Sequence, residues 1–271
     1  NAGAFLVFRM SPVLSKSPEA LGLLAAIGLV TLALASLVML TQTSIKVSLA
    51  WSTVAQMGFM LLECGLGLYS LAMLRLVAHS FYKAHAFLAS GSGVDAFRAP
   101  QIVYAPSGFR PGRLTLSLLI SILSTGAIAY LFGLTPGQQP AILATSAIVA
   151  IALTQLLLQA ANTDRSPSFL LRALAISLLA CLAYFALHAF FAGLMQDSAL
   201  PVLTTGGFQY ALAVLVVIFF IFLLVLQHIF RNAKGSAWEA IYVHLYNGMY
   251  VDVYITRMLQ RFWPITQKIR A

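Results

Sequence analysis

Charged residues are scarce in this sequence. Only 8% of its 271 residues are Asp, Glu, Lys or Arg, whereas 61% are hydrophobic. A soluble domain has about 25% charged residues. The scarcity excludes a soluble globular protein and indicates an integral membrane protein.

Acidic residues are fewer still. The chain has 7 Asp and Glu against 16 Lys and Arg, which gives a formal net charge of +9. In a soluble protein this balance would suggest nucleic acid as a partner. Here the basic residues lie mostly in predicted loops and near the C-terminus, so membrane topology explains them and we expect no nucleic acid.

Motifs for metal binding and catalysis are also missing. The 2 cysteines, Cys64 and Cys181, lie in separate apolar segments, which argues against a disulfide or a zinc site. The sequence contains no P-loop, no GxGxxG after a strand, no CxxC and no HExxH. We therefore expect no enzymatic activity, no metal and no cofactor in this chain.

Long apolar runs fill most of the chain. A membrane-spanning helix needs about 20 mostly apolar residues. Segments of this kind are predicted at 19–41, 46–67, 69–91, 114–134, 139–161, 168–195 and 207–230. The fold class is therefore an all-α transmembrane helix bundle over residues 1–231, followed by an amphipathic cytoplasmic or interfacial tail over 232–271.

The N-terminal run "NAGAFLVF" is apolar from its first residues. It has no basic region followed by a cleavage site, so it is not a signal peptide. We interpret it as the end of an earlier span and expect the chain to be the C-terminal part of a longer one.

The loop charges predict the orientation. Alternation of the spans puts most basic residues on one side, namely Lys46, Arg98, Arg110, Arg113, Arg165, Arg172 and those after residue 230. Basic residues favour the cytoplasmic side. We expect a multi-pass protein of the bacterial inner membrane with a cytoplasmic C-terminus.

The segment "LRLVAHSFYKAHAFL" (74–88) carries four basic residues inside a predicted span. Arg75, His79 and Lys83 follow one another at intervals of four, so they share a helix face; His85 follows two residues later. A charged side chain at the centre of a span costs about 2.5–3.5 kcal/mol, which favours a functional role. A lysine beside a histidine can form a proton relay; the alternative is a lysine held by buried carbonyls or by an acid.

Glu63 is the acid that lies well inside a predicted span, in the helix before this one. A short turn joins the two helices, so we expect Glu63 to pair with Arg75, either structurally or to tune a pathway. Lys46 begins the second predicted span. It either extends to the membrane surface or links the relay to water.

The tail is rich in aromatic residues. Tyr242, Tyr246, Tyr250 and Tyr254 recur every four residues, which would line one flank of a helix that follows Trp238, and Gly248 can interrupt that helix. One interpretation is a helix at the headgroup level, with aromatics inward and cations outward. The other is a docking surface for a cytoplasmic partner, and the two are compatible.

Residues 41–92 resemble the core of the antiporter-like subunits of respiratory complex I and of the Mrp cation/proton antiporters. The matching pieces are "SIK" at 44–46, "AWST" at 50–53, "QMGFM" at 56–60, "HS" at 79–80, "KA" at 83–84 and "FL" at 87–88. The resemblance implies that Lys83 is the central proton carrier. It also implies that His79 and Lys46 take part.

Two departures limit the resemblance. Arg75, a permanent cation, stands where the family has a histidine. The spans from 114 to 230 contain no lysine, whereas complex I subunits have one in a second broken helix. The exit path of complex I is therefore not transferable to this chain.

Two further blocks, "HSFYKAHAFLASGSGVDAFR" and "SAWEAIYVHLYNGMYVDVYITRML", look like the membrane subunit of DAB-type inorganic-carbon accumulation complexes. The resemblance implies a large cytoplasmic partner, similar to a β-carbonic anhydrase, that holds zinc. It implies that flow of protons or Na+ powers the hydration of CO2 in that partner. The alternatives are a redox-driven proton pump, an Mrp-type antiporter subunit and an inert scaffold.

Overall fold

The computed structural model describes residues 2–89, 111–134, 140–163, 166–195, 207–232 and 235–263, and in these ranges every regular element is helical. The predicted spans correspond to long helices: α3 (Pro18–Thr41), α4 (Ile45–Gly65), α5 (Tyr69–Ala89), α7 (Pro111–Leu131), α8 (Pro140–Thr163), α9 (Pro167–Leu194) and α10 (Gly207–Asn232). Two short helices, α1 (Ala2–Arg9) and α2 (Ser11–Leu14), precede them. The all-α membrane fold is confirmed.

Length and apolar composition alone identify 5 of these helices as able to cross a membrane: α3, α4, α7, α8 and α9. The basic residues of α5 lower its hydropathy, although it has the same length of 21 residues as α4. α10 is 26 residues long, and Tyr210–Leu226 is the apolar part of it whose side chains the structure describes. The remainder of the predicted loop at 92–113, before α7, lies outside the described residues.

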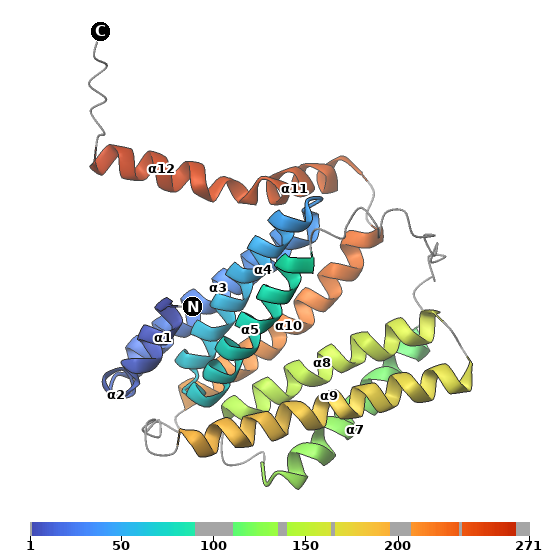
Figure 1. The fold of residues 1–271 in the computed structure, drawn as a ribbon. Helices are drawn as coiled ribbons and strands as arrows, with labels where there is room; N and C mark the ends of the chain where they lie inside the picture. Colours follow the sequence, from blue (N-terminus) through green and yellow to red (C-terminus); the bar gives the residue numbers. More distant parts are fainter. Residues whose placement is uncertain are drawn as a thin grey trace.

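The helices form two groups that lie against each other (Figure 1). In one group α3 packs along α4, and α4 packs on α5; in the other α7, α8 and α9 contact one another. Contacts of α5 with α9, and of α10 with α8, join the groups. The main apolar core is formed by buried residues of α3, α4, α5 and α10, such as Leu62, Leu71 and Val216, and half-buried side chains of α8 and α9 pack against it.

Local sequence sets several helix ends. Ser17 caps α3 by accepting a hydrogen bond from the Ala20 N–H at 3.3 Å, and Pro18 follows at the first helical position. α4 ends at a glycine turn, where Gly67 has φ +77° and the Leu68 N–H donates to the Glu63 carbonyl at 2.8 Å. This turn sends the chain straight back into α5, so α4 and α5 are antiparallel neighbours.

Close backbone approach between α3 and α4 depends on glycine. A Cβ atom on Gly28 would lie 2.5 Å from the Leu62 backbone nitrogen, and one on Gly58 would lie 2.7 Å from the Leu32 nitrogen. Small residues let membrane helices approach closely. The contact fixes α4, which carries half of the candidate site.

The tail folds as α11 (Ser236–Tyr246), a 3-10 turn η2 (Gly248–Tyr250) and α12 (Val251–Phe262). The helix is interrupted where the sequence places Gly248, which has φ +61°. Figure 1 shows α11 lying across the ends of α3 and α4, and α12 projecting beyond them. The turn between α3 and α4, the end of α10 and the tail therefore lie at the same end of the bundle.

Candidate functional site

Three of the four basic residues of α5 lie on one face that packs against the bundle, as their spacing predicts. His79 is 6% exposed and Lys83 is 7% exposed, and the side chain of Arg75 is 25% exposed. α5 packs against α4 and α9. The structure therefore brings these three side chains to one side of α5, in a row two turns long.

The ammonium group of Lys83 is bound to α4. It donates a hydrogen bond to the Leu49 carbonyl at 2.5 Å and another to the hydroxyl of Ser52. Ser52 in turn donates to the Leu49 carbonyl at 3.1 Å. The predicted alternative of a lysine held by a buried carbonyl is thus found, and the same geometry puts an exchangeable hydroxyl proton beside the amine.

Two aromatic rings flank the same ammonium group. The Lys83 Nζ atom lies 5.9 Å from the ring centroid of Tyr82 and 5.8 Å from that of Phe87. Rings within about 6 Å attract a cation through their quadrupole. The charged form of Lys83 therefore has partners on both sides, one polar and one aromatic.

The predicted pair between Glu63 and Arg75 is present. Arg75 Nη2 lies 2.9 Å from Glu63 Oε1, and Arg75 Nε donates to Oε2 at 3.0 Å. Glu63 is 1% exposed. This fork geometry is the strong form of a charge-assisted hydrogen bond, and it pins the start of α5 to the end of α4.

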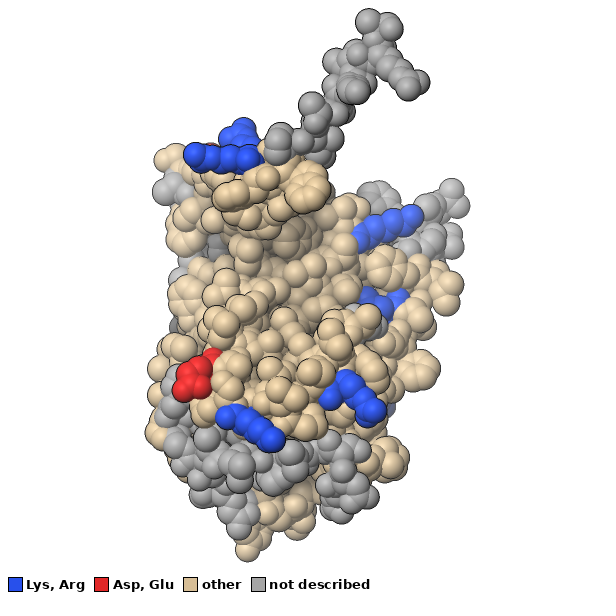
Figure 2. Space-filling model, turned by 90° about the vertical axis from the view of Figure 1, so that its left-hand side faces the viewer, with Lys and Arg blue, Asp and Glu red and all other residues tan. Residues whose placement is uncertain are grey.

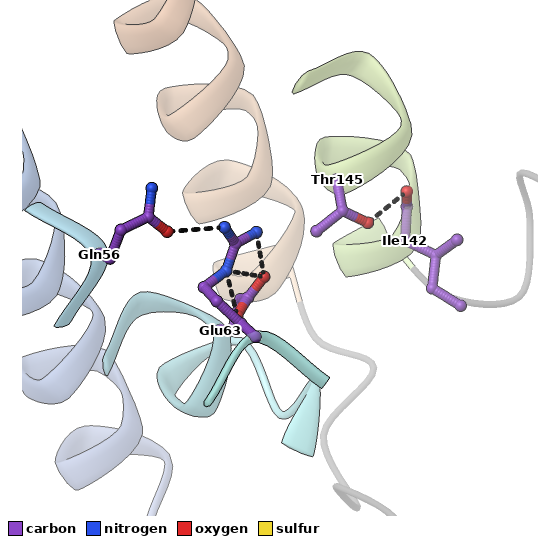
Figure 3. Close-up of polar contacts among 5 residues, drawn as sticks. Gln56, Glu63, Ile142 and Thr145 are labelled. Carbon is purple, nitrogen blue, oxygen red and sulfur yellow. Dashed lines mark hydrogen bonds and ion pairs between the residues drawn. The ribbon is translucent and has the colours of Figure 1, made fainter. Parts of the chain in front are cut away.

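Sequence reasoning missed two partners of Arg75. Its Nη1 atom donates to Gln56 Oε1 at 3.0 Å (Figure 3). Its guanidinium carbon lies 3.7 Å from the ring centroid of Phe59. Ser52, Gln56, Phe59 and Glu63 are separated by four, three and four residues, so they share one face of α4. That spacing was the available signal, since every one of these side chains contacts a basic residue of α5.

Two predicted pathway residues lie apart from this buried face. Lys46 is exposed in the first turn of α4, one turn before the Leu49 carbonyl. His85 is exposed on α5, two residues after Lys83 and so on the opposite side of that helix. Because α4 and α5 are antiparallel, Lys46 and His85 both lie toward the end of the bundle where the tail is.

Two of the predicted docking residues, Tyr242 and Tyr246, form hydrogen bonds with the turn between α3 and α4. The Tyr242 hydroxyl donates to the Thr41 carbonyl at 3.2 Å, and Tyr246 accepts a hydrogen bond from Gln42 Nε2 at 3.0 Å through its carbonyl. Trp238 is half-buried. Tyr250 lies beyond the interruption with φ 54°. The tyrosines therefore do not form one continuous flank, although the rings of Tyr242 and Tyr246 stack with centroids 6.2 Å apart.

Comparison with known proteins places this site inside a matched family segment. Residues 1–135 match the family described as NADH:quinone oxidoreductase/Mrp antiporter, transmembrane. The segment contains all of α4 and α5, and with them every residue of the Lys83 and Arg75 contacts given above.

Curated relatives extend the match. The chain is 40% identical over 267 residues to the probable inorganic carbon transporter subunit DabB2 of Halothiobacillus neapolitanus, covering 97% of this chain and 48% of the relative. It is 53% identical over 96 residues to the probable inorganic carbon transporter subunit DabB of Hydrogenovibrio crunogenus, covering 35% of this chain and 18% of the relative. It is also 39% identical over 128 residues to NADH-quinone oxidoreductase subunit L of Rhodobacter capsulatus, covering 47% of this chain and 18% of the relative.

The chain thus spans about half the length of DabB2. Its long apolar helices and the family match make it a multi-pass membrane protein. With the buried basic face of α5 and its α4 partners all inside the matched segment, the chain belongs to the NADH:quinone oxidoreductase/Mrp antiporter family of transmembrane proteins.

Proposed function

We propose that this chain is the proton- or Na+-conducting part of a membrane subunit that powers inorganic-carbon accumulation. The similarity to DabB2 supports this, because it extends over 97% of the chain, well beyond the segment that the antiporter family shares. In the proposed complex, cation flow through this subunit drives the hydration of CO2 to bicarbonate in a cytoplasmic partner.

One observation carries the conducting role: the Lys83 amine lies between two helices, bonded to the Ser52 hydroxyl and the Leu49 carbonyl. His79 is buried one turn away on the same face. In the proposed transfer, the neutral amine of Lys83 accepts a proton from the protonated imidazole of His79 and then releases it toward Lys46 and water. The Ser52 hydroxyl accepts a hydrogen bond from the charged amine and donates its own to the Leu49 carbonyl, so it stabilises the protonated form of Lys83 without carrying the proton itself.

The Glu63–Arg75 pair supplies fixed charge in the proposed mechanism. Arginine does not release its proton in proteins, so Arg75 cannot be a carrier. Its bonds to Glu63 and Gln56 hold a positive charge two turns from Lys83. Glu63 balances this charge, so an incoming cation is repelled less. The pair therefore tunes the access of a cation from the outer half of the bundle to Lys83.

Lys46 and His85 complete the proposed path at the other end. Both are exposed and lie toward the end of the bundle that carries the tail. We place this end in the cytoplasm of a bacterial cell with the chain in the inner membrane, because basic residues favour the cytoplasmic side. Charge released by Lys83 leaves through these residues to water.

The proposed partner is a large zinc-binding subunit similar to carbonic anhydrase, docked on the exposed flank of α11. Tyr242 and Tyr246 are 43% and 44% exposed, so both keep surface for a partner beside their bonds to the α3–α4 turn. Zinc and the hydration step belong to that partner. This chain contributes the cation path and no bond-breaking step.

A second candidate is a proton-pumping subunit of a redox enzyme, or a subunit of an Mrp-type antiporter. The similarity to NADH-quinone oxidoreductase subunit L over 128 residues favours it. The candidates differ in what purifies with the full-length protein. A zinc protein supports the carbon role, iron–sulfur or flavin subunits support the redox role, and several small membrane subunits support the antiporter role.

Growth at ambient CO2 tests the proposal directly. The host lacks its own carbonic anhydrases and expresses the full-length protein with its neighbouring large cytoplasmic gene product. We expect rescue by the wild type and loss of rescue with Lys83→Ala. Lys16→Ala, at an exposed lysine before α3, is the matched control and should rescue normally.

Immunoblots of the membrane fraction must show equal amounts of the wild type, Lys83→Ala and Lys16→Ala. Rescue by Lys83→Ala at wild-type abundance would overturn the conducting role of Lys83. Failure of an abundant, assembled wild type to rescue would overturn the carbon role and favour the redox or antiporter candidate.

A further inference from the structure

The tail is fixed to the bundle at the boundary of two spanning helices. α3 ends at Thr41 and α4 begins at Ile45, and between them Gln42 donates to the Tyr246 carbonyl at 3.0 Å. Tyr242 bonds the Thr41 carbonyl from the same helix, α11. Spanning helices end near the membrane surface. These bonds therefore hold the end of α11 at the level of the headgroups.

The turn after α11 sets the direction of α12. Met249 and Tyr250 have φ 55° and 54°, in the left-handed region, and end one helix before the next begins. Gly248 packs against Trp51 of α4, where an added Cβ atom would lie 2.8 Å from the indole ring. From this fixed point α12 leads away from the ends of α3 and α4 and projects past them (Figure 1).

An apolar stripe covers one side of α12. Its members recur at helical spacing and comprise Val251, Ile255, Met258, Leu259 and Phe262. Four of them are well exposed: Ile255 48%, Met258 52%, Leu259 56% and Phe262 78%. No residue of α12 is buried by the part of the chain that the structure describes. The stripe is a continuous apolar surface, and Trp263, 77% exposed, extends it.

The opposite side of α12 is polar and basic. Thr256, Arg257 and Gln260 lie there around Val253, and Asp252 and Arg261 lie at the two borders with the stripe. Figure 2 shows basic side chains at the outer edge of the tail, away from the bundle. Arg257 lies more than a quarter turn from every member of the stripe, whereas Arg261 borders the stripe beside Met258. The centre of the stripe therefore faces away from Arg257, toward the membrane level.

We propose that α12 lies in the headgroup layer of the lipid bilayer, with the stripe from Val251 to Phe262 in the acyl boundary and Arg257 and Arg261 among anionic headgroups. Three observations support lipid as the partner of the stripe: α11 is held at the headgroup level, α12 projects past the ends of the spanning helices, and its apolar stripe faces away from Arg257. A helix of this kind, with a strong apolar face and a basic polar face, is typical of interfacial helices. Aromatic residues such as Phe262 and Trp263 fit the same layer.

The proposed lipid contact also supports the proposed cation path through Lys83, because it fixes the position of the tail. Trp51 lies one residue before Ser52, which bonds Lys83, and Gly248 rests on Trp51. Lipid therefore holds, through η2, the turn of α4 that carries the Lys83 partners. This role is independent of which ion passes and of which partner the complex contains.

Spin-label accessibility in the full-length protein tests the contact. Single cysteines are introduced at Ile255 and Leu259 on the stripe, and at Thr256 and Gln260 on the polar side as matched controls. The native cysteines, Cys64 and Cys181 among them, are replaced by alanine. The protein is reconstituted in vesicles of phosphatidylethanolamine and phosphatidylglycerol, and collision rates with oxygen and with a nickel chelate are measured.

We expect labels at Ile255→Cys and Leu259→Cys to collide several-fold more with oxygen than with nickel, because oxygen concentrates in acyl chains. Labels at Thr256→Cys and Gln260→Cys should show the reverse. High nickel accessibility at all four sites would overturn the proposal, because the helix would then lie in water. Low accessibility to both reagents on the stripe would also overturn it, because protein would then cover α12.

Lipid charge tests the arginines separately. Replacing phosphatidylglycerol with phosphatidylcholine should shift the Ile255→Cys label to a shallower position in the wild-type background. The shift should be absent when Arg257→Gln and Arg261→Gln are added. An equal shift in both backgrounds would contradict the role given to the arginines.

Discussion

Lys83 is the residue on which the mechanism depends, and its chemistry distinguishes a carrier from a fixed charge. Lys83→Arg keeps a cation that can still donate to the Leu49 carbonyl and the Ser52 hydroxyl. Arginine does not give up its proton, so a carrier is lost while the charge remains. We expect this variant to assemble normally and to lose proton transfer as completely as Lys83→Ala. Normal transfer would assign Lys83 a structural role only.

Ser52 is the second test at the residue scale. Its hydroxyl accepts from Lys83 and donates to the Leu49 carbonyl at 3.1 Å. A hydrogen bond to a charged group contributes about 1.5–3 kcal/mol, and each 1.4 kcal/mol corresponds to a factor of ten, so Ser52→Ala should lower proton flux tenfold or more. Ser44→Ala is the control, because Ser44 is exposed and its side chain makes no cap bond. Equal flux in the two variants would remove Ser52 from the path.

The Glu63–Arg75 pair should matter for stability. Removing one partner of a fully buried pair costs about 3–5 kcal/mol; here the charge left unpaired is that of Arg75, whose side chain is 25% exposed, so a smaller cost is expected. Glu63 is 1% exposed, so Glu63→Gln should lower the melting temperature of the detergent-solubilised protein clearly. Glu19→Gln, at an exposed acid in the first turn of α3, should leave it almost unchanged. Adding Arg75→Gln to Glu63→Gln should recover part of the loss, since no unpaired charge then remains.

At the scale of elements, the sequence determined the helices far better than their contacts. Hydrophobic runs and prolines predicted the long helices, and the short turn after Gly67 predicted that Glu63 meets Arg75. These features depend on residues that are close together in the chain, so they can be predicted from one sequence. The contact of Gly248 with Trp51 joins segments far apart in the chain, and no local pattern encodes it.

The α4 partners of Lys83 and Arg75 show the same limit. Ser52 and Gln56 stand in the segment that resembled the antiporter family, and their spacing with Glu63 places them on one face. No pattern in the sequence predicts that this face of α4 is turned toward α5. That rotation follows from the glycine contacts between α3 and α4, which fix the opposite side of α4.

Glycine packing gives a prediction for elements. Gly28→Ala places a Cβ atom 2.5 Å from the Leu62 nitrogen, and the backbone of α4 must move away. Overpacking of this kind typically costs about 1–3 kcal/mol. Gly126→Ala in α7 is the control, since a Cβ atom there meets nothing within 4 Å. We expect a lower melting temperature and lower proton flux for Gly28→Ala only, and equal behaviour of the two variants would contradict the close packing of α3 on α4.

At the scale of the molecule, two helix groups and a surface tail place one polar site inside an apolar bundle. The site joins α4 and α5 in the group that also holds α3, and α9 of the second group packs on α5. The tail closes the end of the bundle toward which Lys46 and His85 lie. α4 therefore bonds Lys83 on one side and supports Gly248 through Trp51, so the proposed cation path and the proposed lipid contact of the tail both depend on it.

Cation flux through the reconstituted full-length complex tests the central claim most directly. Vesicles carry an internal pH dye and an internal Na+ dye, and flux is measured under an imposed gradient of each ion for the wild type, Lys83→Ala and Lys16→Ala. We predict flux of one of the two ions in the wild type and in Lys16→Ala, and flux at the level of protein-free vesicles in Lys83→Ala. Wild-type flux in Lys83→Ala would contradict a path through Lys83.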